Sequence, residues 1–461
     1  MAIVGAFMVP HPPMIVPGVG KGSEKQIEET VKAYEKVAEE IADLKPETII
    51  ITSPHSIMYS DYFHISPGAG AEGAFSGFRA PEVNFKEKYD EDFVNTVCDF
   101  AEESDFPAGI LGEREKRLDH GTMVPLWFIR KKYSGGKIVR IGLSGLPLTD
   151  HYRLGQMIKA TSEKLDRKTV FVASGDLSHK LKDYGPYGFA KEGPIYDEKI
   201  MDVAGRAAFG EMLKFDENFC DKAAECGHRS FVIMAGALDK MAVETEKLSH
   251  QDVTGVGYGI CTFHPIGEDV NRAFLDKYLD ELKKNLYEKN RDADSYVKCA
   301  RASLESYIIE RKVMGIPRDI PDEMLRNKAG VFVSIHKQGR LRGCIGTTGP
   351  TTKCIAEEII QNAISASTRD PRFDPIKPEE LEWLEINVDV LGKPEPIESS
   401  DELDVKKYGV IVTSGRKRGL LLPDLDGVDT VEEQIEIAKR KAGINPGEKI
   451  SLERFEVVRH I

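Results

Sequence analysis

Three histidines in the N-terminal half of the chain each follow a run of apolar residues. His11, His55 and His179 come after the runs at 3–10, 48–52 and 169–173. Such runs, rich in β-branched residues, are typical of strands buried on both faces of an α/β sheet. The C-terminal edge of these sheets presents ligand-binding groups. Each histidine alone could be a structural imidazole, but three together indicate a metal or catalytic site.

Two imidazoles and one carboxylate leave open coordination positions, which is the arrangement of a non-heme Fe(II) site. His11 and His55 supply the imidazoles. The later segment 224–229, Ala-Glu-Cys-Gly-His-Arg, is dense in ligand types, and we predict Glu225 as the third ligand. Cys226 and His228 are rivals, because a Cys226 thiolate would favour Zn(II) or Cu(I). If Glu225 is the third ligand, Glu225→Ala should lower metal affinity more than Cys226→Ser. Alternatively, Glu225 is a solvated residue at the start of a helix and binds no metal.

Two further histidines could move protons. An imidazole titrates near pH 6.5, so it can take a proton from a phenol and later return it. We assign this role to His179, with His120 as a second group beside the substrate. Asp176 could orient His179 or cap a helix. Tyr184 and Tyr187 are candidates for the pocket wall, although both could simply belong to a turn.

Length and composition define the class of protein. The chain has 461 residues, of which 41% are apolar and 30% charged, and its length predicts two or three soluble domains. Its net charge of −13 argues against general affinity for nucleic acids. No apolar run reaches the ~20 residues that span a bilayer, and no signal peptide is recognisable. Seven scattered cysteines without a CxxC pair favour a reducing, cytoplasmic location and no membrane association.

Strand and helix patterns alternate through the first 266 residues. They predict an α/β domain with a mixed sheet flanked by helices. Strands are expected at 3–10, 48–52, 137–146, 169–173 and 255–264, the last closing the sheet, and helices at 91–103, 152–165, 195–209 and 218–240, with another capped by Ser23. The segment 117–125, which carries His120, is predicted to be a glycine-interrupted loop.

A charged helical stretch at 267–291 separates this domain from a second one at 292–461. In the second domain, helices are expected at 296–311, 354–367 and 430–442, and strands at 330–336, 384–391 and 409–412. Helices do not regularly separate these strands, so we predict an α+β domain with an antiparallel sheet.

Four short motifs of the first domain occur in a suggestive order: His-Pro-Pro at 11–13, Ser-Pro-His at 53–55, Leu-Asp-His-Gly at 118–121 and Gly-Asp-Leu-Ser-His at 175–179. Over residues 1–266 they resemble the class III extradiol dioxygenase superfamily (LigB-like), to which the Memo proteins are similar. The resemblance implies Fe(II) held by His11, His55 and a late glutamate, and a small aromatic substrate such as a catechol or aminophenol. It also implies that His179 is the acid/base and that His120 lies by the substrate. Memo proteins place a cysteine in the late ligand region, which corresponds to Cys226.

Three motifs of the second domain, LRGCIG at 341–346, DPRF at 370–373 and GLLLP at 419–423, resemble the AMMECR domain family. The fused arrangement resembles proteins of the AmmeMemoRadiSam system. That resemblance implies a radical-SAM enzyme and a separate Memo-like protein as companions, and an anaerobic setting that argues against O2 as a co-substrate. Within LRGCIG, we expect Cys344 to be a packing residue, because nothing nearby in the sequence activates it.

Three functions fit these observations. The first is an Fe(II)-dependent, ring-cleaving dioxygenase. The second keeps the metal without oxygenation, as a hydrolase, a lyase or an accessory protein beside a radical enzyme, and Cys226 favours it over the first. The third is a scaffold that uses the AMMECR domain to recruit a partner.

Overall fold

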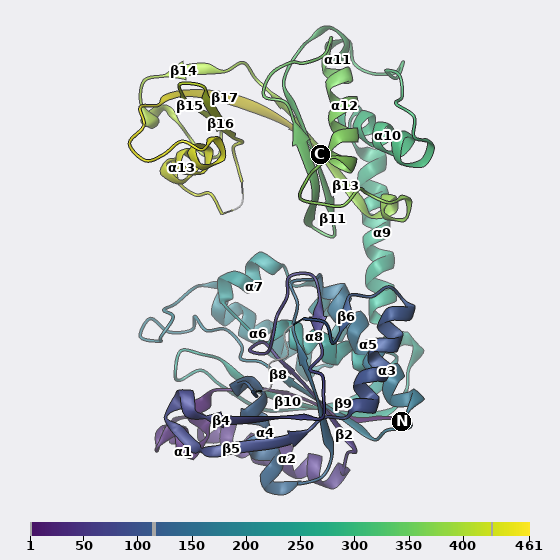
Figure 1. Cartoon of the computed structure of the whole chain (residues 1–461), viewed down its shortest axis with the longest axis vertical. Helices are drawn as coiled ribbons and strands as arrows, with labels where there is room; N and C mark the ends of the chain where they lie inside the picture. The colour runs from purple at the N-terminus through teal and green to yellow at the C-terminus, as the bar shows by residue number, and fades with distance from the viewer. Residues whose placement is uncertain (1, 113–116, 426) are drawn as a thin grey trace. The chain divides into compact units, whose positions relative to one another are not determined.

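The computed structural model describes residues 2–112, 117–425 and 427–461. The chain divides into two compact units, Met1–Leu279 and Asp280–Ile461, and the division falls within the long helix α9 (Phe274–Asp292) (Figure 1). The expected order, an α/β domain followed by an α+β domain, is confirmed.

A six-stranded mixed sheet forms the centre of the first unit. Its strand order is β7-β2-β8-β1-β10-β9, in which the first four strands are parallel and the last two antiparallel. The strands are β1 (Ile3–Val9), β2 (Thr48–Ser53), β7 (Lys137–Gly142), β8 (Thr169–Ser174), β9 (Met241–Gln251) and β10 (Tyr258–Glu268). The parallel strands therefore end at one common edge, where the predicted histidines follow them.

Helices cover both faces of this sheet (Figure 1). Along β2, Ile49 and Ile51 join one apolar core and Ile50 the other, because successive side chains of a strand point to opposite faces. The first core contains α2 (Glu28–Leu44) and α4 (His120–Lys132); the second contains α3 (Glu91–Glu103), α5 (Leu148–Lys164), α6 (Glu192–Gly205) and α8 (His228–Ala237). Smaller elements are α1 (Pro17–Gly20), α7 (Glu217–Ala223), β3 (Phe63–His64), β6 (Ala108–Gly109) and a hairpin of β4 (Gly70–Phe75) and β5 (Ala80–Lys88).

The loop predicted at 117–125 was wrong from His120 onward, where α4 begins. The Asp119 side chain accepts the Thr122 amide at 3.0 Å and so caps the helix. Pro125 lies inside α4, where its missing N–H leaves one carbonyl of the preceding turn without a helical partner.

Three other expectations also needed correction. The helix predicted at 218–240 is two helices, α7 and α8, separated at Ala224, whose backbone is left-handed (φ 53°). β10 does not close the sheet, because β9, which the sequence did not reveal, pairs outside it. Ser23 begins a 3-10 turn, and α2 begins only at Glu28.

The second unit contains a seven-stranded antiparallel sheet with the path β12-β11-β13-β17-β15-β16 and β14 beside β17. Its strands are β11 (Val331–Lys337), β12 (Arg340–Gly346), β13 (Leu384–Leu391), β14 (Glu395–Ile397), β15 (Tyr408–Ser414), β16 (Lys417–Leu421) and β17 (Ser451–His460). The helices are α10 (Ser295–Glu310), α11 (Asp322–Arg326), α12 (Ile355–Thr368) and α13 (Val431–Ala442).

The LRGCIG motif forms strand β12 and packs closely against α12. A Cβ on Gly343 would lie 2.2 Å from the carbonyl oxygen of Ala366, so only glycine permits this approach. Cys344 is half-buried, accepts the Ser334 hydroxyl at 3.3 Å and donates its amide to Asp370. Its expected packing role remains a prediction.

Candidate metal centre

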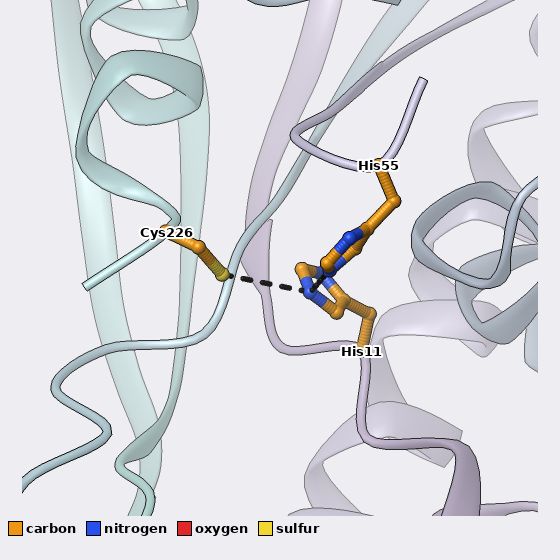
Figure 2. Close-up of side chains that lie close together, drawn as sticks. All are labelled: His11, His55 and Cys226. Carbon is orange, nitrogen blue, oxygen red and sulfur yellow. Dashed lines mark hydrogen bonds between the residues drawn. The ribbon is translucent and has the colours of Figure 1, made fainter. Parts of the chain in front are cut away.

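Two histidines and one cysteine meet at the C-terminal edge of the parallel strands. His11 follows β1, His55 lies in the turn after β2, and Cys226 lies between α7 and α8. The two Nε2 atoms are 3.0 Å apart, and Cys226 Sγ is 3.6 Å from His11 Nε2. Figure 2 shows the three side chains pointing toward one another from separate segments. His11 and His55 therefore lie together at one rim, and their role as metal ligands remains a prediction.

These separations are close to those that ligands of one shared cation require, with the two imidazole nitrogens slightly nearer to each other. In a tetrahedral site, nitrogens ~2.0 Å and sulfur ~2.3 Å from the ion lie about 3.3–3.6 Å from one another. All three ligand atoms lie within 4.8 Å. Desolvation lowers the pKa of His11 well below its usual value, which keeps the imidazole neutral, as a ligand must be. Desolvation also raises the pKa of the Cys226 thiol, so a bound cation would be needed to displace its proton.

A buried serine orients the His11 ring. Ser174 Oγ donates its single proton to the Gly121 carbonyl at 2.6 Å, so it must accept from His11 Nδ1 at 3.0 Å. The Gly121 carbonyl is available because Pro125, four residues later, has no N–H to donate to it. His11 Nε2 therefore carries the lone pair and faces His55. A second hydrogen bond of this kind is the usual way in which proteins orient a metal-binding histidine.

A carboxylate network supports the turn that carries His55. Ser53 Oγ donates to Asp119 at 2.6 Å, and the His55 amide donates to Ser53 Oγ at 3.2 Å. The guanidinium of Arg140, which is 1% exposed, lies 3.7 Å from the Asp119 carboxylate. The network ties the turn after β2 to the start of α4.

Asp176 joins two ligand-bearing segments. Its Oδ1 accepts the backbone amide of His11 at 2.7 Å, and its own amide donates to Cys226 Sγ at 3.3 Å. The Cys226 amide donates in return to the Asp176 carbonyl at 3.3 Å. The sequence left Asp176 open between orienting His179 and capping a helix; in the structure its carboxylate accepts the backbone amide of His11. These hydrogen bonds connect the segments of His11 and Cys226.

His179 is oriented by a backbone carbonyl. Its Nδ1 donates to the Ala224 oxygen at 2.5 Å, which leaves Nε2 as the basic nitrogen. Ala224 has the left-handed backbone that ends α7, an uncommon conformation for a residue with a Cβ and one found often at functional sites. The ring of Tyr187, whose side chain is 61% exposed, packs edge-on against His179 with centroids 5.1 Å apart.

His120 packs close to the rings of both His55 and His11. The centroids of the His120 and His55 rings are 3.9 Å apart, and Phe78 lies edge-on to His120 at 5.4 Å. Desolvation, followed by the proximity of His55 and His11, lowers the pKa of His120 to about 4. His120 is therefore neutral at pH 7, which suits a hydrogen-bonding role better than that of a cation.

Glu225, the predicted third ligand, lies outside the cluster, and Cys226 occupies its place. The Glu225 carboxylate accepts the His228 amide at 2.6 Å, and desolvation raises its pKa to about 7. In this irregular turn the neighbouring side chains diverge, so Cys226 reaches the imidazoles while Glu225 is held at the start of α8. The structure thus favours the alternative ligand that the sequence left open.

A cavity of about 260 Å³ opens beside the cluster. Its walls include the side chains of His55, Cys226 and Glu225, and the apolar Met58 and Leu148. This volume is below the usual range for drug-sized ligands and suits a single aromatic ring.

The other predicted pocket residues have different positions. His228 lines the cavity, but its Nε2 donates to the Met212 carbonyl at 2.9 Å and its Nδ1 contacts the Tyr196 hydroxyl, so it is a structural imidazole. Tyr184 is 76% exposed, and neither it nor Tyr187 is among the described residues that line the cavity.

Two residues of the site were missed in the sequence. Ser174 is the last residue of β8, so its position at the rim that bears the histidines was the available signal. Arg229, beside His228, also lines the cavity, and its guanidinium lies 3.6 Å from Glu217. It belonged to the 224–229 segment, but nothing in that segment indicated which way it points.

Two glycines permit the contact between the segments that carry Asp176 and Cys226. A Cβ on Gly175 would lie 2.1 Å from the Cα of Gly227. We expect Gly175→Ala to separate the two segments, lowering metal affinity about 10-fold to 100-fold and destabilising the fold by about 1–3 kcal/mol. Chelator competition and thermal unfolding measure the two effects. Gly77→Ala is the matched control, because a Cβ there has no neighbour within 4 Å, and an equal loss in both variants would contradict this explanation.

The fold and the site define a class: an α/β domain with a candidate metal site at the rim of its sheet, joined to an α+β domain. Comparison with known families agrees. Residues 5–261 match the family described as the catalytic LigB subunit of aromatic ring-opening dioxygenase, and residues 297–460 match AMMECR1. The chain therefore belongs to the LigB family, with an AMMECR1 domain fused to it.

One relative matches the whole chain, and others match about a third of it. A protein of Clostridium acetobutylicum is 42% identical over 100% of this chain and 99% of its own length. A protein of Thermotoga maritima is 51% identical over 36% of this chain and 96% of its own length. An uncharacterized protein of Pyrococcus horikoshii with a crystal structure is 34% identical, with a TM-score of 0.34, over 37% of this chain and 91% of its own. None of the described helices is long and apolar enough to cross a bilayer.

Proposed function

We propose that the N-terminal domain is a metal-dependent enzyme that acts on a small phenolic compound of the catechol or aminophenol type. The observation that carries the proposal is the meeting of His11, His55 and Cys226 beside a cavity the size of one ring. Membership of the LigB family supports the same class of chemistry.

Each residue has a distinct part in this proposal. His11, His55 and Cys226 would hold the ion, and, when bound, the ion would lower the pKa of a coordinated hydroxyl group. His179 would accept the hydroxyl proton at Nε2 and return it later, since the Ala224 carbonyl occupies the other ring nitrogen. Neutral His120 is not among the described residues that line the cavity, but its ring packs against His55, so it would hydrogen-bond a substrate group held at the ion. Met58 and Leu148 would exclude water from one side of the ring.

The Cys226 ligand favours a second candidate, a metal-dependent protein that does not use O2. A thiolate in place of a carboxylate shifts the preference of the site from Fe(II) toward Zn(II) or Cu(I). In this form the domain would be a hydrolase, a lyase or an accessory protein, with a radical-SAM enzyme and a Memo-like protein as companions.

Anaerobic purification followed by metal analysis tests the proposal. We expect one metal ion per chain and turnover of catechol or 2-aminophenol. Absorbance measures the conversion of the substrate, and an oxygen electrode measures the uptake of O2. Substrate conversion without O2 uptake would select the second candidate. Protein that contains no stoichiometric metal and binds none on reconstitution would contradict both.

A further inference from the structure

A groove of about 980 Å³ lies on the first unit between β5 and the C-terminal end of α4. It shares no described residue with the cavity of the metal centre. Seven consecutive residues of β5, 82–88, form one wall, and residues of α4 and of the turn before β7 form the other. The groove therefore follows the length of a strand.

The groove is positively charged although the chain is acidic. Among the residues that the structure describes, six lysine or arginine side chains and three glutamates line it, whereas the whole chain carries −13. Arg130 and Glu87 neutralise each other at 2.6 Å. Lys88, Lys131 and Lys137 are exposed and have no carboxylate partner within the described parts of the chain. Three ammonium groups thus face one groove together with the carboxylates of Glu47 and Glu82, and the charges of the described lining residues sum to +3.

An aromatic ring lies among these cations. Trp127 lines the groove, and Lys131 Nζ lies 3.6 Å from the centroid of its ring. A half-buried tryptophan beside lysine stems offers an apolar surface next to positive charge, and tryptophan is enriched where proteins bind partners.

The strand that forms the groove wall has a free edge. β5 pairs with β4 on one side only, and no other strand pairs with residues 80–88 among those the structure describes. The next residue, Tyr89, bridges to Ile138 of β7, so the chain leaves the groove toward the main sheet. Unpaired backbone groups on such an edge can accept an added strand.

We propose that this groove binds an extended acidic segment of a partner protein, which adds a strand to β5 with its carboxylates facing Lys88, Lys131 and Lys137. Charge complementarity selects an acidic occupant, and the free edge selects an extended backbone. The proposal does not depend on the metal chemistry.

The test uses the full chain and a synthetic peptide of alternating glutamate and valine. Isothermal titration calorimetry measures the affinity, and Trp127 reports the location through its fluorescence in a Trp383→Phe background, because the chain has only two tryptophans. We expect saturable binding that weakens with salt and shifts the Trp127 emission. The triple variant K88E/K131E/K137E should lower the affinity about 10-fold to 100-fold, since each exposed charge contributes modestly.

Two controls decide between modes of binding. A matched charge reversal at exposed lysines of the second unit, K353E/K393E/K449E, should leave the affinity unchanged. A peptide N-methylated at alternate residues keeps its charge but cannot pair with β5, so it should bind at least 10-fold more weakly.

Several results would overturn the proposal: no peptide binding, binding that survives the triple reversal, equal binding of the N-methylated peptide, or equal competition by inorganic phosphate or oligo-dT, which would indicate a general anion patch. Sedimentation velocity tests whether a second copy of this chain occupies the groove instead. A dimer that dissociates in the triple variant, without peptide binding, would assign the groove to a second copy of this chain.

Discussion

Replacing His179 by alanine should lower turnover by about 10²-fold to 10⁴-fold while the protein keeps its metal. This is the usual contribution of a positioned general base. The Nδ1 of His179 is occupied by the Ala224 carbonyl, and its ring is not part of the three-residue ligand cluster. Steady-state kinetics with the best substrate from the catechol and aminophenol assays measures the loss. Metal analysis of the same preparation shows whether the ligands remain intact.

Binding and turnover can be separated in this variant. Catechol should still bind, seen as a charge-transfer band when the site is loaded with ferric iron. His264→Ala is the matched control, because that imidazole pairs with Glu40 and is not among the residues of the cluster or its cavity. Loss of metal in His179→Ala would make this residue a ligand. Unchanged turnover would make it a bystander, and the proposed proton transfer would fail.

The second large effect concerns Cys226. Cys226→Ser should lower metal affinity by more than the ~10-fold to 100-fold typical of a residue that only supports a ligand. The physical reason is that Cys226 Sγ lies 3.6 Å from His11 Nε2, whereas the Glu225 carboxylate is hydrogen-bonded to the start of α8. Competition with a chromophoric chelator gives the affinity for Zn(II) and Fe(II).

Two variants isolate the thiol. Cys220→Ser removes another thiol that lines the same cavity and should leave the affinity unchanged. Glu225→Gln keeps the shape of the side chain and should change the affinity less than 10-fold, on the scale of a supporting group. A larger loss in Glu225→Gln than in Cys226→Ser would restore the carboxylate as the third ligand.

The sequence by itself determined the parts of this protein that depend on local periodicity. β2 occupies Thr48–Ser53 and β13 occupies Leu384–Leu391, close to or identical with the predicted ranges. Runs of β-branched residues predict such strands well, because a strand buried on both faces needs apolar side chains at every position. His11 and His55 could then be placed at one rim, since parallel strands end at the same edge of their sheet.

Tertiary structure decided what these side chains contact. Glu225 and Cys226 are adjacent in an aperiodic turn, where no repeat specifies which way a side chain points. The choice between them depends on the close approach of Gly227 to Gly175, a contact between residues far apart in the chain.

The start of α4 shows the same limit. The glycine and proline of 117–125 favoured a loop, but the Asp119 cap and packing against the sheet stabilise a helix. One backbone carbonyl of this helix has no helical hydrogen-bond partner, because Pro125 lacks an N–H. That carbonyl, of Gly121, takes the proton of Ser174 and thereby sets the orientation of His11. Local sequence determines which residues reach the rim of the sheet. The partners of their side chains lie in distant segments, 45 residues away for His179 and 163 residues away for His11, so only the folded chain decides what they do.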